Sequence, residues 1–180
     1  MSRYVPDVRV RRSSPNHSSR AGVAPALIVL HSTESANLPG TNRDLVNIAD
    51  YLSRPEVKAS SHVIVDGDGH SARLVADERA AWTQRAYNRA SLSVEQIGRA
   101  ASESWTEAEV REAARWVARW SKRYGIPLRR AEVHDGRVVR AGVTTHRALG
   151  ELGGGHVDPG DRYPFTRAIE LARFYRSKLG

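Results

Sequence analysis

The chain has 180 residues, of which 40% are hydrophobic and 27% are charged, the balance of an ordinary globular protein. A chain of this length is expected to form one domain that buries about 70% of its unfolded surface. It contains no cysteine, which excludes disulfides and requires that any metal site use histidine, aspartate or glutamate. The longest apolar stretch, at 21–30, is far shorter than the roughly 20 residues of a membrane-spanning helix.

The net charge of +8 arises from 28 basic and 20 acidic residues, and 25 of the basic residues are arginine. A positive balance predicts attraction to polyanions such as nucleic acid, an acidic cell wall or a membrane surface. The arginine content is also typical of proteins encoded by GC-rich genomes. Residues 1–20 are polar and basic and contain no apolar core of a signal peptide, so we expect none.

The N-terminal half predicts an arm, a strand, a helix and a hairpin. Residues 1–20 have no sustained periodicity, which favours a flexible or extended arm. The unbroken apolar run at 26–30 predicts a strand that is buried on both faces. A helix is expected to start at Thr41 or Asn42 and to continue to about Ser53. Strands at 61–65 and 71–76 are then joined by a tight turn at 66–69, where Asp-Gly supplies the required backbone angles.

The C-terminal half continues the alternation of strands and helices. A strand is expected at 91–98, and a helix at 106–124 is marked by a capping box at Thr106 and Glu109. The remaining elements are a strand at 137–146, a glycine-rich loop at 150–161 and a last helix at about 164–178. Because strands alternate with helices, the fold class is predicted to be α/β, with a central mixed β-sheet flanked by helices.

Two histidines and one aspartate could together form a metal site. His31 ends the first buried strand in the segment IVLHST, His146 lies in GVTTHRAL, and Asp158 follows in HVDPG. Two histidines, a carboxylate and a water complete the tetrahedron of a catalytic zinc site. None of these spacings is diagnostic alone, since a single histidine is more often a core or surface residue.

Five segments in a fixed order extend this pattern: IVLHST, SSHVIVDGDG, AWTQRAYNRASLSVEQIG, GVTTHRAL and HVDPG. Their order resembles that of the type-2 N-acetylmuramoyl-L-alanine amidases, a superfamily that includes phage amidases and the peptidoglycan recognition proteins. The resemblance covers about residues 26–165. It implies a mixed sheet flanked by helices, a zinc amidase domain over 21–180, and hydrolysis of the bond between muramic acid and L-alanine.

The resemblance also assigns residues to roles. It places the zinc ligands on His31, His146 and Asp158, in the group whose third ligand is aspartate. Glu95 matches the glutamate that this group uses in catalysis, whereas Ser61 stands where some phage members have a tyrosine. His156 replaces a lysine that is common in the family.

Each of these assignments has an alternative. Glu95 would otherwise be an exposed strand carboxylate paired with an arginine, and His156 a solvated loop residue. If the roles hold, Glu95 transfers protons and His156 stabilises the oxyanion. Trp82, Tyr87 and Asn88 are candidates to line a glycan or peptide groove, or else to pack locally within their loop.

The function expected from the resemblance is a zinc-dependent peptidoglycan hydrolase that binds one Zn²⁺ and acts as a lysin. Its partners would be peptidoglycan or muropeptides, with anionic wall polymers attracted by charge. It would be made in the cytoplasm and reach the wall after release, although cytoplasmic recycling of muropeptides is an alternative. A non-catalytic recognition module is the second interpretation. Specific nucleic-acid binding is not expected, because no known motif accompanies the dispersed basic residues.

Overall fold

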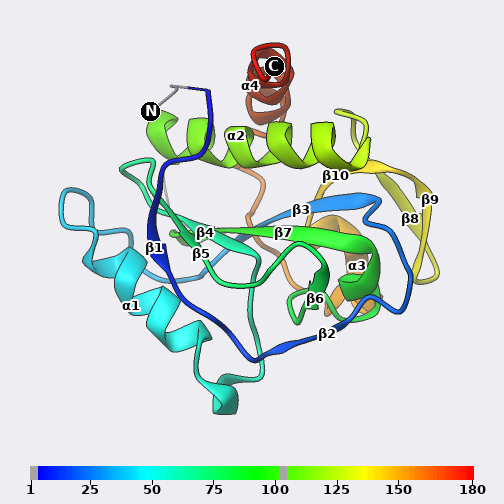
Figure 1. The fold of residues 1–180 in the computed structure, drawn as a ribbon, viewed down its shortest axis with the longest axis horizontal. Coiled ribbons are helices and arrows are strands. Elements are labelled where there is room, and N and C mark those ends of the chain that lie inside the picture. Colours follow the sequence, from blue (N-terminus) through cyan, green and yellow to red (C-terminus); the bar gives the residue numbers. More distant parts are fainter. Residues whose placement is uncertain (1–3, 102–104) are drawn as a thin grey trace.

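A six-stranded mixed β-sheet runs through the centre of the protein, in a computed structural model that describes residues 4–101 and 105–180 (Figure 1). Only β4 and β5 run antiparallel, as the predicted hairpin requires, and the other neighbours are parallel. The predicted α/β fold with a central mixed sheet is therefore confirmed. In sheet order the strands are β1 (Val8–Arg11), β5 (Ser71–Arg73), β4 (Val63–Val65), β7 (Ser91–Gln96), β3 (Leu27–Ser32) and β10 (Gly142–Thr145).

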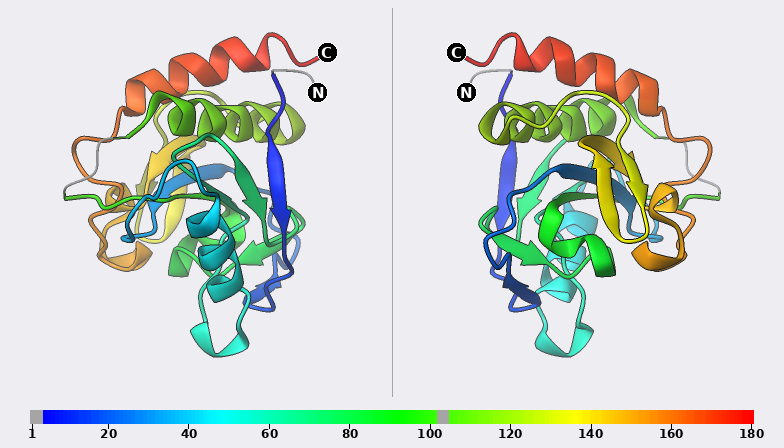
Figure 2. Two further views of the ribbon diagram at one scale, coloured as in Figure 1. Left: turned by 90° about the vertical axis from the view of Figure 1, so that its left-hand side faces the viewer. Right: turned by 90° about the vertical axis from the view of Figure 1, so that its right-hand side faces the viewer.

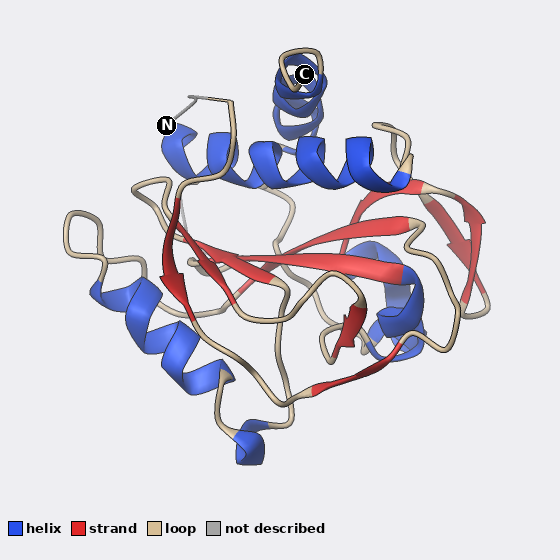
Figure 3. Cartoon of the chain, viewed as in Figure 1, coloured by secondary structure: helices blue, strands red, loops and turns tan. Residues whose placement is uncertain are grey.

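Helices cover both faces of this sheet (Figures 2 and 3). On one face lies α2 (Glu107–Tyr124), and α4 (Phe165–Arg176) packs across it. On the other face lies α1 (Arg43–Leu52). Alternation along each strand supplies the two cores: Val63 and Val65 contact the α2 cluster, whereas Ile64 contacts the α1 cluster.

The longest helix begins and ends where the sequence predicts. The Thr106 hydroxyl accepts a hydrogen bond from the Glu109 amide at 3.1 Å, which caps the first turn of α2. Gly125 follows α2 with a φ of 68°, a left-handed conformation that favours glycine. Ten residues of α2 are buried, including Trp116 and Trp120, so the helix packs on the sheet and covers the larger core.

Short elements surround the sheet and correct two expectations. Residues 137–146 do not form one strand, because β9 (Arg137–Arg140) pairs with β8 (Glu132–His134) while β10 joins the central sheet. The glycine-rich loop contains a short helix, α3 (Gly150–Gly153). Three 3₁₀ turns complete the chain: η1 (Pro55–Val57), η2 (Arg85–Ala90) and η3 (Arg147–Leu149).

The segment predicted as a flexible or extended arm is extended and joined to two sheets. β1 pairs with β5, and β2 (His17–Ser19) pairs with β6 (Arg79–Ala81). The Asp7 amide also donates to the Glu112 carboxylate of α2 at 2.7 Å. Residues 1–3 of the predicted arm lie outside the described residues. Within the described part of the chain, no helix is both long and apolar enough to cross a membrane.

Candidate metal centre

Neighbouring strands carry three polar side chains to one edge of the sheet. In β3 and β7 the residues His31 and Glu95 lie directly opposite each other. Because the preceding residues Leu30 and Val94 face α2, His31 and Glu95 face the other side. His146 comes directly after β10, and its amide donates to the Leu30 carbonyl at 3.0 Å. The parallel register therefore brings distant parts of the sequence to one place.

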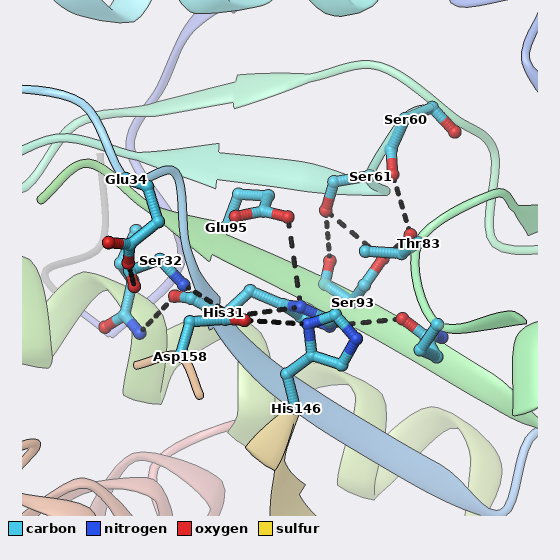
Figure 4. A network of polar contacts seen from close by, with 12 residues as sticks. His31, Ser32, Glu34, Ser60, Ser61, Thr83, Ser93, Glu95, His146 and Asp158 are labelled. Carbon is cyan, nitrogen blue, oxygen red and sulfur yellow. Dashed lines mark hydrogen bonds and ion pairs between the residues drawn. The ribbon is translucent and has the colours of Figure 1, made fainter. Parts of the chain in front are cut away.

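The Asp158 carboxylate joins the two histidines (Figure 4). Its Oδ1 lies 2.9 Å from His146 Nδ1, and its Oδ2 lies 3.4 Å from His31 Nδ1. The Ser32 amide donates to Oδ2 at 3.1 Å, which fixes the carboxylate against the end of β3. The side chains are only 1% exposed for His31, 6% for His146 and 7% for Asp158.

Outer hydrogen bonds orient both imidazole rings. His31 Nε2 lies 3.1 Å from Gln84 Oε1, and His146 Nε2 lies 3.0 Å from the Gly153 carbonyl. Carbonyl oxygens only accept hydrogen bonds, so each Nε2 carries the hydrogen and each Nδ1 offers its lone pair to the centre. Gln84 is itself held, because its amide nitrogen donates to the Ser91 hydroxyl.

The donor set fits a zinc ion. The ligand atoms of His31, His146 and Asp158 all lie within 4.8 Å of one another. Ligands at about 2.0–2.1 Å from a tetrahedral Zn²⁺ are separated by about 3.3 Å. The two nitrogen–oxygen distances of 2.9 and 3.4 Å bracket that separation. Three protein ligands leave one position free, as in catalytic zinc sites.

Burial and charge give the cluster the protonation that a metal requires. Burial lowers the pKa of His31 to about 4, so its imidazole is neutral at pH 7. Burial alone would raise the pKa of Asp158, but its close contacts with the polar imidazoles of His146 and His31 outweigh burial and hold that pKa well below its usual range. A neutral imidazole and an ionised carboxylate are the forms that bind a cation.

Glu95 lies beside this cluster with one oxygen unsatisfied. Its Oε1 is 3.9 Å from His31 Nδ1, and its buried Oε2 has no hydrogen-bond partner among the described residues. Burial, followed by the charges of Asp158 and Glu34, raises the pKa of Glu95 well above its ordinary value. None of the described arginines pairs with it, so the alternative of an arginine-paired strand carboxylate is not observed.

His156, the fifth residue of this group, contacts the cluster through a stacked ring. Its imidazole stacks on that of His146, with ring centroids 4.5 Å apart and an angle of 21° between the planes. The side chain is exposed on the loop after α3, and it lines the groove next to the cluster. The ring is thus fixed against His146 while it remains open to the groove.

A groove of about 320 Å³ opens over the cluster. Trp82, which is 38% exposed, lines it as predicted. The side walls come from the β3–α1 loop, from α1 and from the segment before β4. Its lining residues are Ser32, Thr33, Glu34, Ile48, Tyr51, Leu52, Ala59, Ser60, Trp82, Thr83, Glu95, His146, His156 and Asp158.

Two residues predicted to line a groove do not do so. Tyr87 is 2% exposed and packs in a core cluster with Leu27 and Leu149. The Asn88 side chain accepts hydrogen bonds from the amides of Thr83 and Gln84, at 3.1 and 2.7 Å. Local packing and loop bonding therefore account for both, and Asn88 acts on the site only by shaping the loop that carries Gln84.

The sequence analysis did not identify four residues around the site. Gln84 and the Gly153 carbonyl orient the two imidazole rings, and Glu34 and Tyr51 line the groove. Gln84 stands in AWTQRAYNRASLSVEQIG, one of the five ordered segments, and its place in that segment was the one available signal. A backbone carbonyl such as that of Gly153 leaves no signal in a sequence.

A buried histidine supports the strands below the site. His62 lies in the segment before β4, and its Nδ1 is 2.9 Å from the Ser93 hydroxyl of β7. Its Nε2 is 3.1 Å from the guanidinium of Arg20. Burial, followed by the charge of Arg20, lowers the pKa of His62 to about 3. His62 is therefore a structural residue of the sheet and is not part of the His31–His146–Asp158 cluster.

The family model for N-acetylmuramoyl-L-alanine amidases matches residues 21–161, most of the chain and all of the residues around the groove. The chain belongs to the N-acetylmuramoyl-L-alanine amidase family. In this amidase, Asp158, His31 and His146 form one contiguous cluster. No curated protein sequence matches the chain.

Solved structures of amidases share the fold. The Staphylococcus aureus hydrolase AmiA, solved with its ligand, is 22% identical over 96% of this chain and 84% of its own, with a TM-score of 0.70. An AmpD derivative is 19% identical over 90% and 93%, with a TM-score of 0.64. The endolysin amidase LysCS of Clostridium intestinale is 15% identical over 94% and 97%, with a TM-score of 0.65.

Proposed function

We propose that the protein is a zinc-dependent amidase that cleaves the bond between N-acetylmuramic acid and the L-alanine of the stem peptide. One observation carries this proposal: the buried His31 joins His146 and Asp158, which line an open groove, and the cluster lies beside Glu95 with its unsatisfied Oε2. Membership of the amidase family supplies the substrate class.

His31, His146 and Asp158 would hold the zinc ion through two Nδ1 atoms and a carboxylate oxygen. When bound there, a zinc ion would supply Lewis-acid chemistry that polarises the scissile carbonyl and promotes ionisation of the nucleophilic water. Glu95 would accept the proton of the attacking water and return it to the leaving amine of L-alanine. Its raised pKa suits both tasks, because the carboxyl group holds the proton between the two transfers.

His156 is proposed to donate a hydrogen bond to the oxyanion that forms on the attacked carbonyl. Its ring lies on His146 and faces the groove, so it can reach a substrate atom without contacting the metal position. The variant His156→Ala should therefore lower turnover while it retains zinc. Trp82 and Tyr51 would form apolar walls for the glycan or peptide.

The biological role that we favour is that of a lysin, made in the cytoplasm and acting on the cell wall after release. The net charge of +8 suits contact with anionic wall polymers, and the fold is shared with the endolysin LysCS. Recycling of muropeptides in the cytoplasm is the alternative role. The two roles use the same chemistry and differ in whether the substrate is the intact wall.

Mass spectrometry of digested peptidoglycan tests the activity. Cleavage at the proposed bond yields stem peptides with a free L-alanine amine and glycan strands with intact lactyl carboxylates. Zinc removal should abolish these products, and zinc addition should restore them. Products cut within the glycan or within the peptide would contradict the proposal. Binding to the wall without any cleavage would instead identify a non-catalytic recognition module.

A further inference from the structure

Two further cavities lie along the C-terminal half of α2. They share no lining residue with the substrate groove. Their volumes are about 480 and 460 Å³, and Val5, Pro6, Arg119 and Arg123 line both. Shared walls make them one continuous trough. We call it the basic trough, because it is lined by Arg11, Arg73, Arg119, Lys122 and Arg123.

The acidic residues of the trough are already engaged. Asp77 and Glu78 are the acidic side chains among its lining residues. Asp77 pairs with Arg73, and Glu78 pairs with Arg123 at 2.7 Å. Arg73 also lies 5.2 Å over the ring of Trp116, which fixes its position further. These two ion pairs neutralise both acidic side chains. The other basic side chains leave the trough with a net positive charge.

Two arginines of the trough have no polar side-chain partner among the described residues. Arg11 and Arg119 are exposed, and neither side chain makes a hydrogen bond or ion pair with any described residue. A guanidinium presents a planar fork of N–H donors that matches a phosphate group in two-point contact. The guanidinium groups of Arg11 and Arg119 are therefore available to bind a phosphate group from outside the protein.

We infer that the basic trough binds a polyanion whose phosphate groups repeat along a polyol backbone. This inference rests on the proposed function, which places the enzyme against the cell wall. A continuous trough with separate free cations suits several phosphates of one chain better than a single ion. Proteins that bind single-stranded nucleic acid offer exposed aromatic rings on which bases stack. Trp116, the aromatic residue among those lining the trough, is 4% exposed and covered by Arg73.

The position of the trough gives this binding a consequence. The trough is built by β1, β5 and α2, whereas the catalytic cluster is built by β3, β7, β10 and the loop after α3. A polymer held in the trough therefore leaves the groove free for the stem peptide. The enzyme would be retained at the wall between successive cleavages.

The experiment is fluorescence anisotropy of a dye-labelled oligo(glycerol phosphate), measured at increasing NaCl. The variant R11Q/R119Q removes the two unpaired arginines. The control R43Q/R137Q removes the same charge from two exposed arginines outside the trough. We expect R11Q/R119Q to weaken binding at least about tenfold and to reduce the slope of log affinity against log salt by about two. The control should stay within about twofold of the wild type.

Three outcomes would overturn the inference: no binding of the oligomer, equal losses in R11Q/R119Q and the control, or equal affinity for a DNA duplex of matched charge. The last outcome would indicate a general polyanion surface. Cleavage of a polymer-free muropeptide by the same variants separates this inference from the proposed function. It should remain at the wild-type rate in R11Q/R119Q, and a loss there would assign the trough to catalysis instead of retention.

Discussion

Among the described residues, two clusters have metal-ligating atoms within 4.8 Å of one another, and they are built in different ways. His31, His146 and Asp158 come from two strand ends and a distant loop, and all three are buried. The second cluster, Asp66, Asp68 and His70, comes from the single turn between β4 and β5. One requires the folded sheet, whereas the other is a local feature of the chain.

The hydrogen bonds of the two clusters show why proximity alone does not make a metal site. In the turn, Asp66 Oδ1 accepts from the amides of Asp68 and His70, and His70 Nδ1 contacts Asn42 Oδ1 at 2.7 Å. These atoms stabilise the turn and its neighbouring loop. At the candidate metal centre the outer bonds are made by Nε2 of each histidine, which leaves both Nδ1 atoms directed at Asp158.

The largest effect is expected when a ligand of the first cluster is removed. His31→Ala or His146→Ala should abolish both bound zinc and amidase activity, because two ligands cannot hold a catalytic zinc ion. The matched variant D68N/H70Q should retain one zinc per chain. Elemental analysis of the purified proteins measures this. Full zinc content in His31→Ala would remove His31 from the ligand set.

The next effect separates proton transfer from metal binding. Glu95→Gln keeps the shape of the side chain but removes its ability to transfer a proton. We expect turnover to fall by about 10²–10⁴-fold while zinc content and thermal stability are retained. Steady-state kinetics on a defined muropeptide measure the change. A variant with near-wild-type turnover would show that another group moves the proton.

A smaller effect is expected at the residue that orients His31. Gln84→Leu removes the oxygen that accepts from His31 Nε2 and should lower zinc affinity by about 10–100-fold. Gln84→Glu keeps that oxygen and should retain most of the affinity. Competition with a chromophoric chelator gives the dissociation constants. If both variants bind zinc equally, Gln84 serves packing and not ligand orientation.

The smallest effect is expected in the turn. Asp66→Asn keeps the oxygen that accepts from two amides, so stability should change by no more than about 1 kcal/mol. Burial is the main cause that raises the pKa of Asp66, so folding favours its protonated form and wild-type stability falls as pH rises above about 3.8.

Asp66→Asn should therefore gain stability relative to the wild type between pH 4 and pH 7. Urea unfolding at both pH values tests this. A relative loss at pH 7 would mean that the charged carboxylate has a partner, as it would if the turn held a cation.

Several features of the fold follow from local patterns in the sequence. The apolar run that forms β3, the Asp-Gly turn after β4 and the cap at Thr106 are each set by a few adjacent residues. Such signals depend on backbone preference and burial, which neighbouring residues determine. The segment before residue 20 carries no such signal, and its strands form only because β5 and β6 offer free edges.

The sequence by itself determined the α/β fold class and named His31, Glu95, His146, His156 and Asp158 through ordered motifs. Tertiary structure decided how they work together. The parallel register sets His31 opposite Glu95, and Asp158 approaches from more than 120 positions further along the chain to accept from the Ser32 amide. It also decided that Tyr87 is a core residue and that Gln84 orients the His31 imidazole. The physical reason is that burial, desolvation and hydrogen-bond direction depend on which elements pack together, and no local pattern records that packing.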